Sequence, residues 1–134
     1  FLDKAYKLNK DDMSINNTLG LLYMGEYDPD IYDPERALQH NQKAFDLDPD
    51  QYTKHNLAMN HLLLENIEKS LELYHELYKD HPTNTDYLES IIVIEQYYGD
   101  PQKANQLLEE LKVVDKEAYD TYLLENSSDT LALP

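Results

Sequence analysis

The sequence contains neither cysteine nor tryptophan, and only three of its 134 residues are glycine. Without cysteine the chain has no disulfide framework, no thiolate zinc site and no cysteine nucleophile. The compartment stays open between the cytoplasm, which we slightly favour, and the periplasm or exterior. Three scattered glycines do not form a glycine-rich loop that cradles phosphate. No apolar run approaches the roughly 18 residues of a membrane span, so we expect no insertion into a membrane.

Basic residues are scarce as well. The chain has 11 lysines and arginines against 27 aspartates and glutamates, which gives a formal net charge of −16. Such a chain repels a phosphate backbone and offers no basic stripe from which binding would release counterions, so we expect no nucleic acid partner. The acidic residues serve mainly to keep the surface solvated, and any recognition through them favours a basic partner.

Helix-forming residues dominate what is present. Leucine, tyrosine, asparagine, aspartate and glutamate are abundant, and this mixture suits helices better than a many-turned β-sandwich. The chain is long enough to bury the core of one domain. Most of the 12 tyrosines fall on apolar stripes. We therefore expect a core position for Tyr6, Tyr23, Tyr74, Tyr78 and Tyr98, and a surface position for Tyr52 and Tyr97.

A helical hairpin recurs along the chain with a period of about 34 residues. One copy predicts helices over 52–65 and 67–80, with Asn66 as the turn and N-cap between them. Apolar residues at i, i+3, i+4 and i+7 give each helix an apolar stripe. Because one hairpin cannot bury its stripe alone, neighbouring hairpins must stack.

The next copy predicts helices over 85–98 and 101–114. Gly99 ends the first of these helices, Asp100 caps the second, and Pro101 lies in its first turn. This combination of a helix stop followed directly by a helix start fixes the position of the hairpin turn.

The copy before these two, 13–50, is longer by a few residues, all of them between its helices. The extra residues form the loop 25–32, after which Asp33 is the N-cap and Pro34 the first helical residue. The start of the chain matches only the second helix of a hairpin, so we expect the chain to be part of a longer protein.

These repeated phrases resemble the tetratricopeptide repeat, and the expanded copy is similar to the related Sel1-like repeat. The tetratricopeptide-like residues are Leu57, Ala58, Ser70, Tyr74, Leu77 and Pro82, followed by Ile91, Ile92, Gly99, Asp100, Lys103, Ala104, Leu108 and Leu111. The Sel1-like residues are Leu19, Gly20, Tyr23, Gly25, Asp33, Arg36, Ala37, Lys43 and Ala44. The resemblance implies an all-α fold, a right-handed superhelix (α-solenoid) of stacked antiparallel helix pairs.

The same resemblance divides the chain into one helical-repeat domain, 1–125, and a flexible tail, 126–134. Within the domain we expect the second half of a repeat at 1–12, the Sel1-like repeat at 13–50, further repeats at 51–84 and 85–116, and a capping helix at 117–125. The tail contains apolar residues after a polar spacer, which raises the hypothesis that it docks into the groove of a neighbouring copy.

The sequence offers no constellation for catalysis, for a metal or for a cofactor. The pairs His55–Met59 and His61–Glu65 share a helix face, but two ligands without a third do not make a metal site. The acidic loop around Asp28 lacks the central glycine and the closing glutamate of a calcium loop. No nucleophile motif is present. We therefore expect a chain that is not an enzyme and that needs no cofactor.

Stacking at a constant rotation brings the first helix of every hairpin to the inner, concave wall. The candidate groove residues are Asn17, Leu21, Met24, Tyr52, His55, Asn56, Met59, Leu63, Glu89, Val93, Gln96 and Tyr97. They predict a protein-interaction scaffold that binds a peptide or protein segment with apolar anchors and basic flanks. The absence of lysine and arginine from this set disfavours a clamp for a peptide carboxylate. The alternative is a structural self-assembly module, a homo-oligomer formed through the end stripes or the tail.

Overall fold

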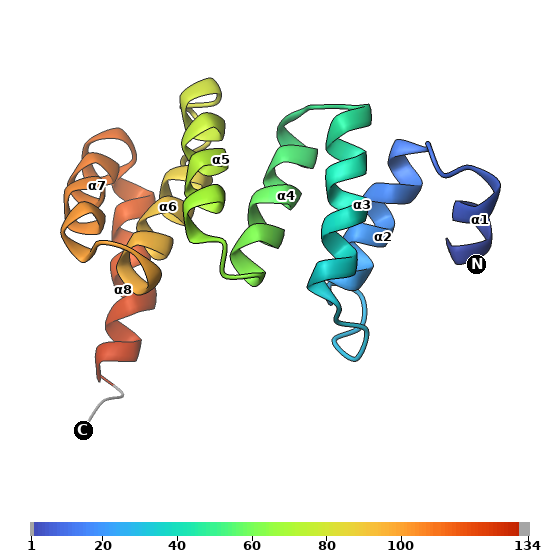
Figure 1. The fold of residues 1–134 in the computed structure, drawn as a ribbon. Helices are drawn as coiled ribbons and strands as arrows, with labels where there is room; N and C mark the ends of the chain where they lie inside the picture. Colours follow the sequence, from blue (N-terminus) through green and yellow to red (C-terminus); the bar gives the residue numbers. More distant parts are fainter. Residues whose placement is uncertain (1, 132–134) are drawn as a thin grey trace. The chain divides into compact units, whose positions relative to one another are not determined.

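A computed structural model describes residues 2–131 of the chain and the side chains of residues 2–126 (Figure 1). The described part is all-α and contains eight helices: α1 (Leu2–Leu8), α2 (Met13–Tyr23), α3 (Pro34–Leu47), α4 (Gln51–Leu63), α5 (Ile67–Asp80), α6 (Thr85–Tyr98), α7 (Pro101–Val114) and α8 (Lys116–Leu131). They belong to two compact units, the first ending at Leu73 and the second beginning at Tyr74. Within the first unit α2, α3 and α4 pack in chain order, and within the second unit α6, α7 and α8 do the same.

The helix starts follow the expected caps. Before α3, the Asp33 side chain accepts a hydrogen bond from the Arg36 backbone N–H at 3.1 Å. Before α7, the Asp100 side chain accepts one from the Gln102 N–H at 2.9 Å, and Pro101 is the first helical residue. Each cap satisfies an N–H that has no partner within the helix, so these short polar side chains set where the helices begin.

Helix α4 differs from its predicted range of 52–65 at both ends. It begins one residue earlier because Asp50 and Thr53 form a capping box. It ends at Leu63 because Glu65 takes a left-handed backbone conformation, with φ of 61°. The Asn66 N–H then donates to the His61 carbonyl oxygen at 2.8 Å, which closes the last turn.

Helix α8 extends beyond the predicted capping helix at 117–125 and reaches Leu131. No glycine or proline occurs between Lys116 and Leu131 to break it, and the Asn126 side-chain amide donates to the Tyr122 carbonyl oxygen at 2.8 Å. The start of the predicted flexible tail is therefore helical, which corrects its expected boundary. Residues 132–134 lie outside the described part, and docking of this tail into another copy stays a prediction.

The core of the first unit lies between α2 and α3. Its buried residues are Leu19, Tyr23, Met24 and Ala37, against which Leu2, Tyr6, Ile15, Leu22 and Met59 pack. The loop between the two helices leaves α2 through Gly25, whose φ of 85° is in the left-handed region that glycine adopts without strain. The Asp33 N–H then donates to the Tyr23 carbonyl oxygen at 2.8 Å, so the loop returns directly to the end of α2.

The core of the second unit joins α6, α7 and α8. Its buried residues are Leu88, Ile92, Ala104, Leu111 and Tyr122, with Tyr78, Leu107, Leu108, Ala118 and Tyr119 packed against them. Tyr98 was expected in the core and is exposed. It is the last residue of α6 and does not belong to this cluster, so the apolar stripe ends one turn earlier than the sequence pattern suggests.

Buried amides connect the helices of the first unit. The Asn41 side-chain amide on α3 donates to Asn60 Oδ1 on α4 at 2.7 Å, and the Asn60 amide donates to the Pro34 carbonyl oxygen at 2.9 Å. Gly20 on α2 lies against the Asn41 side chain, where no Cβ would fit. A buried amide is stable only when its partners are in place, so these contacts specify how α2, α3 and α4 pack.

His40 of α3 is buried in the same unit. Its Nδ1 lies 3.1 Å from Asn16 Oδ1, and the Asn16 amide donates to the Lys10 and Asp12 carbonyl oxygens, each at 2.9 Å. Because the amide orientation leaves Asn16 Oδ1 to accept, we assign the proton of the neutral imidazole to Nδ1. The imidazole is stacked on Tyr23 and meets the edge of another tyrosine ring.

We expect the stability of the first unit to fall as the pH drops below about 6.5. Burial, and after it the positive charge of Arg36, lowers the pKa of His40 below its ordinary value of 6.5, while Asp3 opposes this shift. The unfolded chain then binds a proton more readily than the folded chain. The contribution is fully present above the unfolded pKa and is lost as the pH falls through the folded pKa. Urea unfolding at pH values between about 7 and 5.5 measures it.

His61 needs a matched variant, since burial and Lys69 also lower its pKa. We expect His61→Gln to keep the His40 part of the pH dependence and His40→Gln to remove it. An unchanged pH dependence in His40→Gln would contradict the assignment.

Candidate functional site

The candidate groove residues lie on the first helices of the hairpins. On α2 lie Asn17 and Leu21, and Met24 is the residue that follows the end of this helix. Helix α4 carries Tyr52, His55, Asn56, Met59 and Leu63, and helix α6 carries Glu89, Val93, Gln96 and Tyr97. The α2 and α4 residues belong to the first unit and the α6 residues to the second.

In the first unit the structure brings the α2 and α4 candidates together. The Asn56 side-chain amide donates to Asn17 Oδ1 at 2.8 Å, which joins the first helices of two successive hairpins. Met59 packs against the core between α2 and α3 and is half-buried. The two asparagine amides therefore hydrogen-bond to each other and bridge the helices.

Tyr52 and Leu63, at opposite ends of α4, are exposed, with 71% of Tyr52 accessible to solvent. Met24 differs from the expectation of a groove position, because it is only 8% exposed. Its backbone caps the end of α2, and its sulfur lies 3.1 Å from the Asn41 amide nitrogen, within the core. Met24 is therefore a core residue.

In the second unit the candidates follow one stripe of α6 beside α8. The Tyr97 hydroxyl donates to Asn126 Oδ1 at 3.2 Å, and Val93 and Gln96 are exposed. Glu89, two turns earlier, is half-buried. Burial, and then the negative charges of Asp86, Glu125 and Asp115, raises the pKa of Glu89 above its ordinary value. This end of the stripe is therefore acidic, and burial and the neighbouring carboxylates disfavour the charged form of Glu89.

A cavity of about 200 Å³ opens between α6, α7 and α8 at the other end of this stripe. It is lined by Ile92, Gln96, Tyr97, Ala104, Asn105, Leu108, Tyr122 and Asn126. The apolar residues belong to the core cluster, and amides and phenols complete the lining. Sequence reasoning selected only Gln96 and Tyr97 of this set, because Ile92 was assigned to the repeat pattern and the α7 and α8 residues fall on second and terminal helices.

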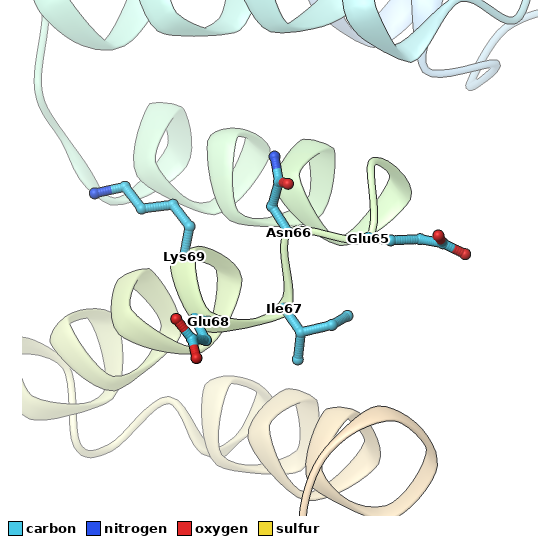
Figure 2. Close-up of a pocket in the computed structure, with 5 residues that line it drawn as sticks. All are labelled: Glu65, Asn66, Ile67, Glu68 and Lys69. Carbon is cyan, nitrogen blue, oxygen red and sulfur yellow. The ribbon is translucent and has the colours of Figure 1, made fainter.

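A wider depression of about 440 Å³ lies at the turn between α4 and α5 (Figure 2). Its lining is one continuous segment, Glu65, Asn66, Ile67, Glu68 and Lys69. Figure 2 shows the Lys69 and Glu65 side chains extending in opposite directions, away from any common point. Lys69 instead meets Glu72 at 3.6 Å. We interpret this feature as the surface of a helix turn, without convergent chemistry.

The described residues contain no group of three or more histidine, aspartate or glutamate side chains arranged to hold a metal ion. His55 and His61 both lie on α4, and neither belongs to such a group. Over the same part of the chain, none of the helices combines the length and apolar character needed to cross a bilayer.

A scan against protein-family models finds no match, and a search of curated proteins finds no relative. Sixteen chains of solved structures match the fold, among them a chain from the crystal structure of MamA, with a TM-score of 0.69 and 16% sequence identity. MamA is a tetratricopeptide-like helical-repeat protein. The present fold is a helical repeat of the same type.

The match to MamA covers 86% of this chain and 65% of that chain. This chain therefore spans less than two thirds of the length of MamA. Within each unit, the helical-repeat fold explains why the helices pack in chain order and why the buried residues recur along them.

Proposed function

We propose that this chain is a non-catalytic scaffold that binds peptide or protein segments through the exposed faces of its first helices, α4 in the first unit and α6 in the second. The supporting observation is that large apolar side chains on these first helices, namely Tyr52, Leu63, Val93 and Tyr97, remain exposed, while the opposite faces of the same helices are buried. Exposed aromatic and aliphatic side chains on rigid helices suit the anchoring of a partner segment.

The chemistry of the partner follows from the charge around these anchors. The chain carries a net charge of −16, and Glu89 on α6 lies among further carboxylates. A partner segment with apolar anchors and basic flanks therefore complements the surface better than an acidic one. Electrostatic complementarity of this kind acts mainly on selectivity and association rate.

Selection from a peptide-display library against the whole chain tests the proposal. We expect enrichment of segments that combine apolar and basic residues, and a loss of affinity of about tenfold in Tyr52→Ala, since truncating an anchor of this kind costs about 1 kcal/mol or more. Titration calorimetry with one enriched peptide measures the change.

Tyr27→Ala is the matched control, because Tyr27 is 64% exposed but lies in the loop between α2 and α3. We expect this variant to keep full affinity. Equal losses in Tyr27→Ala and Tyr52→Ala, or a selection that enriches no peptide, would speak against binding through the first helices.

A second candidate is self-assembly into a homo-oligomer. It is favoured by apolar side chains on the surface of α7 and α8, where Val113 is 84% exposed and Leu124 is also exposed. Light scattering over a range of protein concentrations separates the two candidates. A mass that rises with concentration, and that Val113→Ser lowers, supports assembly.

A further inference from the structure

The cavity in the second unit has the size and lining of a socket for one side chain. Its volume of about 200 Å³ lies below the range of about 300–1,000 Å³ that is usual for small-molecule pockets. Ile92, Ala104 and Leu108 supply apolar surface that is continuous with the core, and Gln96, Asn105 and Asn126 supply amides around it. This arrangement suits an aliphatic side chain whose own backbone meets the Gln96 and Asn105 amides, because the Asn126 amide already donates to the Tyr122 carbonyl oxygen and accepts from the Tyr97 hydroxyl.

The surface next to the cavity sets what must flank such a side chain. Glu89 lies seven residues before Gln96 on the same helix, which corresponds to about 10 Å along the axis. Val93 lies between the two and is exposed, so a segment that runs from the cavity toward Glu89 stays in contact with apolar surface. An extended peptide advances about 3.3 Å per residue and covers this distance in about three residues.

The acidic surroundings of Glu89 favour binding of a cationic group from a partner molecule. Burial, and then the acidic groups Asp86, Glu125 and Asp115, raises the pKa of Glu89, and its charge also acts on the Tyr122 phenol. Two lysines of the second unit are engaged elsewhere: Lys112 lies over the Tyr119 ring at 5.6 Å, and Lys116 pairs with Asp120 at 2.9 Å. A guanidinium or ammonium group placed beside Glu89 would offset repulsion that the folded chain leaves in place.

We propose that the second unit binds an extended peptide segment in which an aliphatic residue occupies the cavity between α6, α7 and α8 and a lysine or arginine three residues away pairs with Glu89. This inference rests on the proposed function, because it names one ligand class and one subsite of that peptide-binding surface. It adds a spacing requirement that the apolar helix face alone does not impose.

Short blocked peptides with a Gly/Ser background test the spacing. One carries Leu and Arg three residues apart, a second carries them adjacent, and a third has citrulline in place of Arg. Titrating each into the uniformly ¹⁵N-labelled chain, we expect the first to bind about fivefold more tightly than the others, the effect of an exposed or half-exposed charge pair. The side-chain amide signals of Gln96, Asn105 and Asn126 should shift with every Leu-containing peptide.

Glu89→Gln should remove the fivefold preference and leave the weaker Leu-dependent binding in place. Glu109→Gln is the matched control, since Glu109 is an exposed acid on α7 outside the cavity lining, and it should keep the preference. A preference that persists in Glu89→Gln, or peptide shifts that avoid the three amides, would overturn the inference. If the display-selected peptides still bind and their affinity still depends on Tyr52, the proposed function stands although the spacing inference for the second unit is overturned. If these peptides do not bind to the first helices at all, the proposed function is wrong as well.

Discussion

Gly20→Ala is expected to destabilise the first unit by about 2 kcal/mol, although alanine is the better helix former by about 1 kcal/mol. Gly20 lies inside α2, and a Cβ there would overlap the side-chain amide of Asn41 on α3. Asn41 cannot move aside at low cost, because its amide donates to Asn60 Oδ1 at 2.7 Å. Relief of the overlap requires α2 and α3 to separate or the buried hydrogen bond to break. Urea unfolding, followed by amide exchange in α2–α4, measures the loss.

A double-mutant cycle isolates the cause. Asn41→Ala removes the atoms that the new methyl group meets, so Gly20→Ala should cost much less in that background than in the native chain. Asn60 loses its hydrogen-bond donor in both variants that carry Asn41→Ala, with and without Gly20→Ala, so this cost cancels in the cycle. Additive effects of the two substitutions would show that close packing against Asn41 is not what requires glycine at this position.

Local signals in the sequence were sufficient to place most helices. Asp33 and Asp100 predicted the starts of α3 and α7, because an N-cap side chain binds a backbone N–H within the next three residues. Helix α6 occupies its predicted range and also begins after an N-cap, Asn84. The predicted end of α4 was wrong by two residues, because Glu65 adopts a left-handed backbone conformation that its residue type does not predict. The predicted end of α8 was wrong because the residues after 125 were assigned to a flexible chain end, although no glycine or proline interrupts the helix before Leu131.

The buried polar residues were not foreseen. Asn41 and Asn60 occupy positions on the inner stripes of α3 and α4, where the pattern predicts apolar residues. The signal was available, since Asn41 falls between the buried Ala37 and Ala44 at helical spacing. What the sequence does not contain is the partner, because the contacts from Asn41 to Asn60 and to Gly20 join residues about twenty positions apart.

The sequence predicted candidate site residues only on the first helices of the hairpins. Exposure of Tyr52 and Tyr97 followed from their place outside the apolar stripes. The cavity depends on three helices at once, and its α7 and α8 residues, such as Asn105 and Asn126, carry no sequence signal of their own. Because a cavity forms where packing is incomplete, it is a property of the assembled unit, and helix periodicity alone cannot reveal it.

Leu111→Ala is expected to be the most damaging single truncation in the second unit, at about 3 kcal/mol. Leu111 on α7 is completely buried, and it packs with Leu88 and Ile92 of α6 and Tyr122 of α8. Its removal leaves an apolar void that these helices cannot fill without moving together. Because Tyr122 also lines the cavity, loss of this packing should weaken the Leu-containing peptides as well as lower the free energy of unfolding.

Val113→Ala, two residues further along the same helix, is the matched control. Val113 is 84% exposed, and its truncation should change stability by no more than about 0.5 kcal/mol and leave peptide binding unchanged. The comparison separates burial from helix propensity, since both substitutions introduce alanine into the last turn of α7. Similar unfolding free energies for the two variants would mean that Leu111 does not hold α6, α7 and α8 together, and the cavity would then need another structural basis.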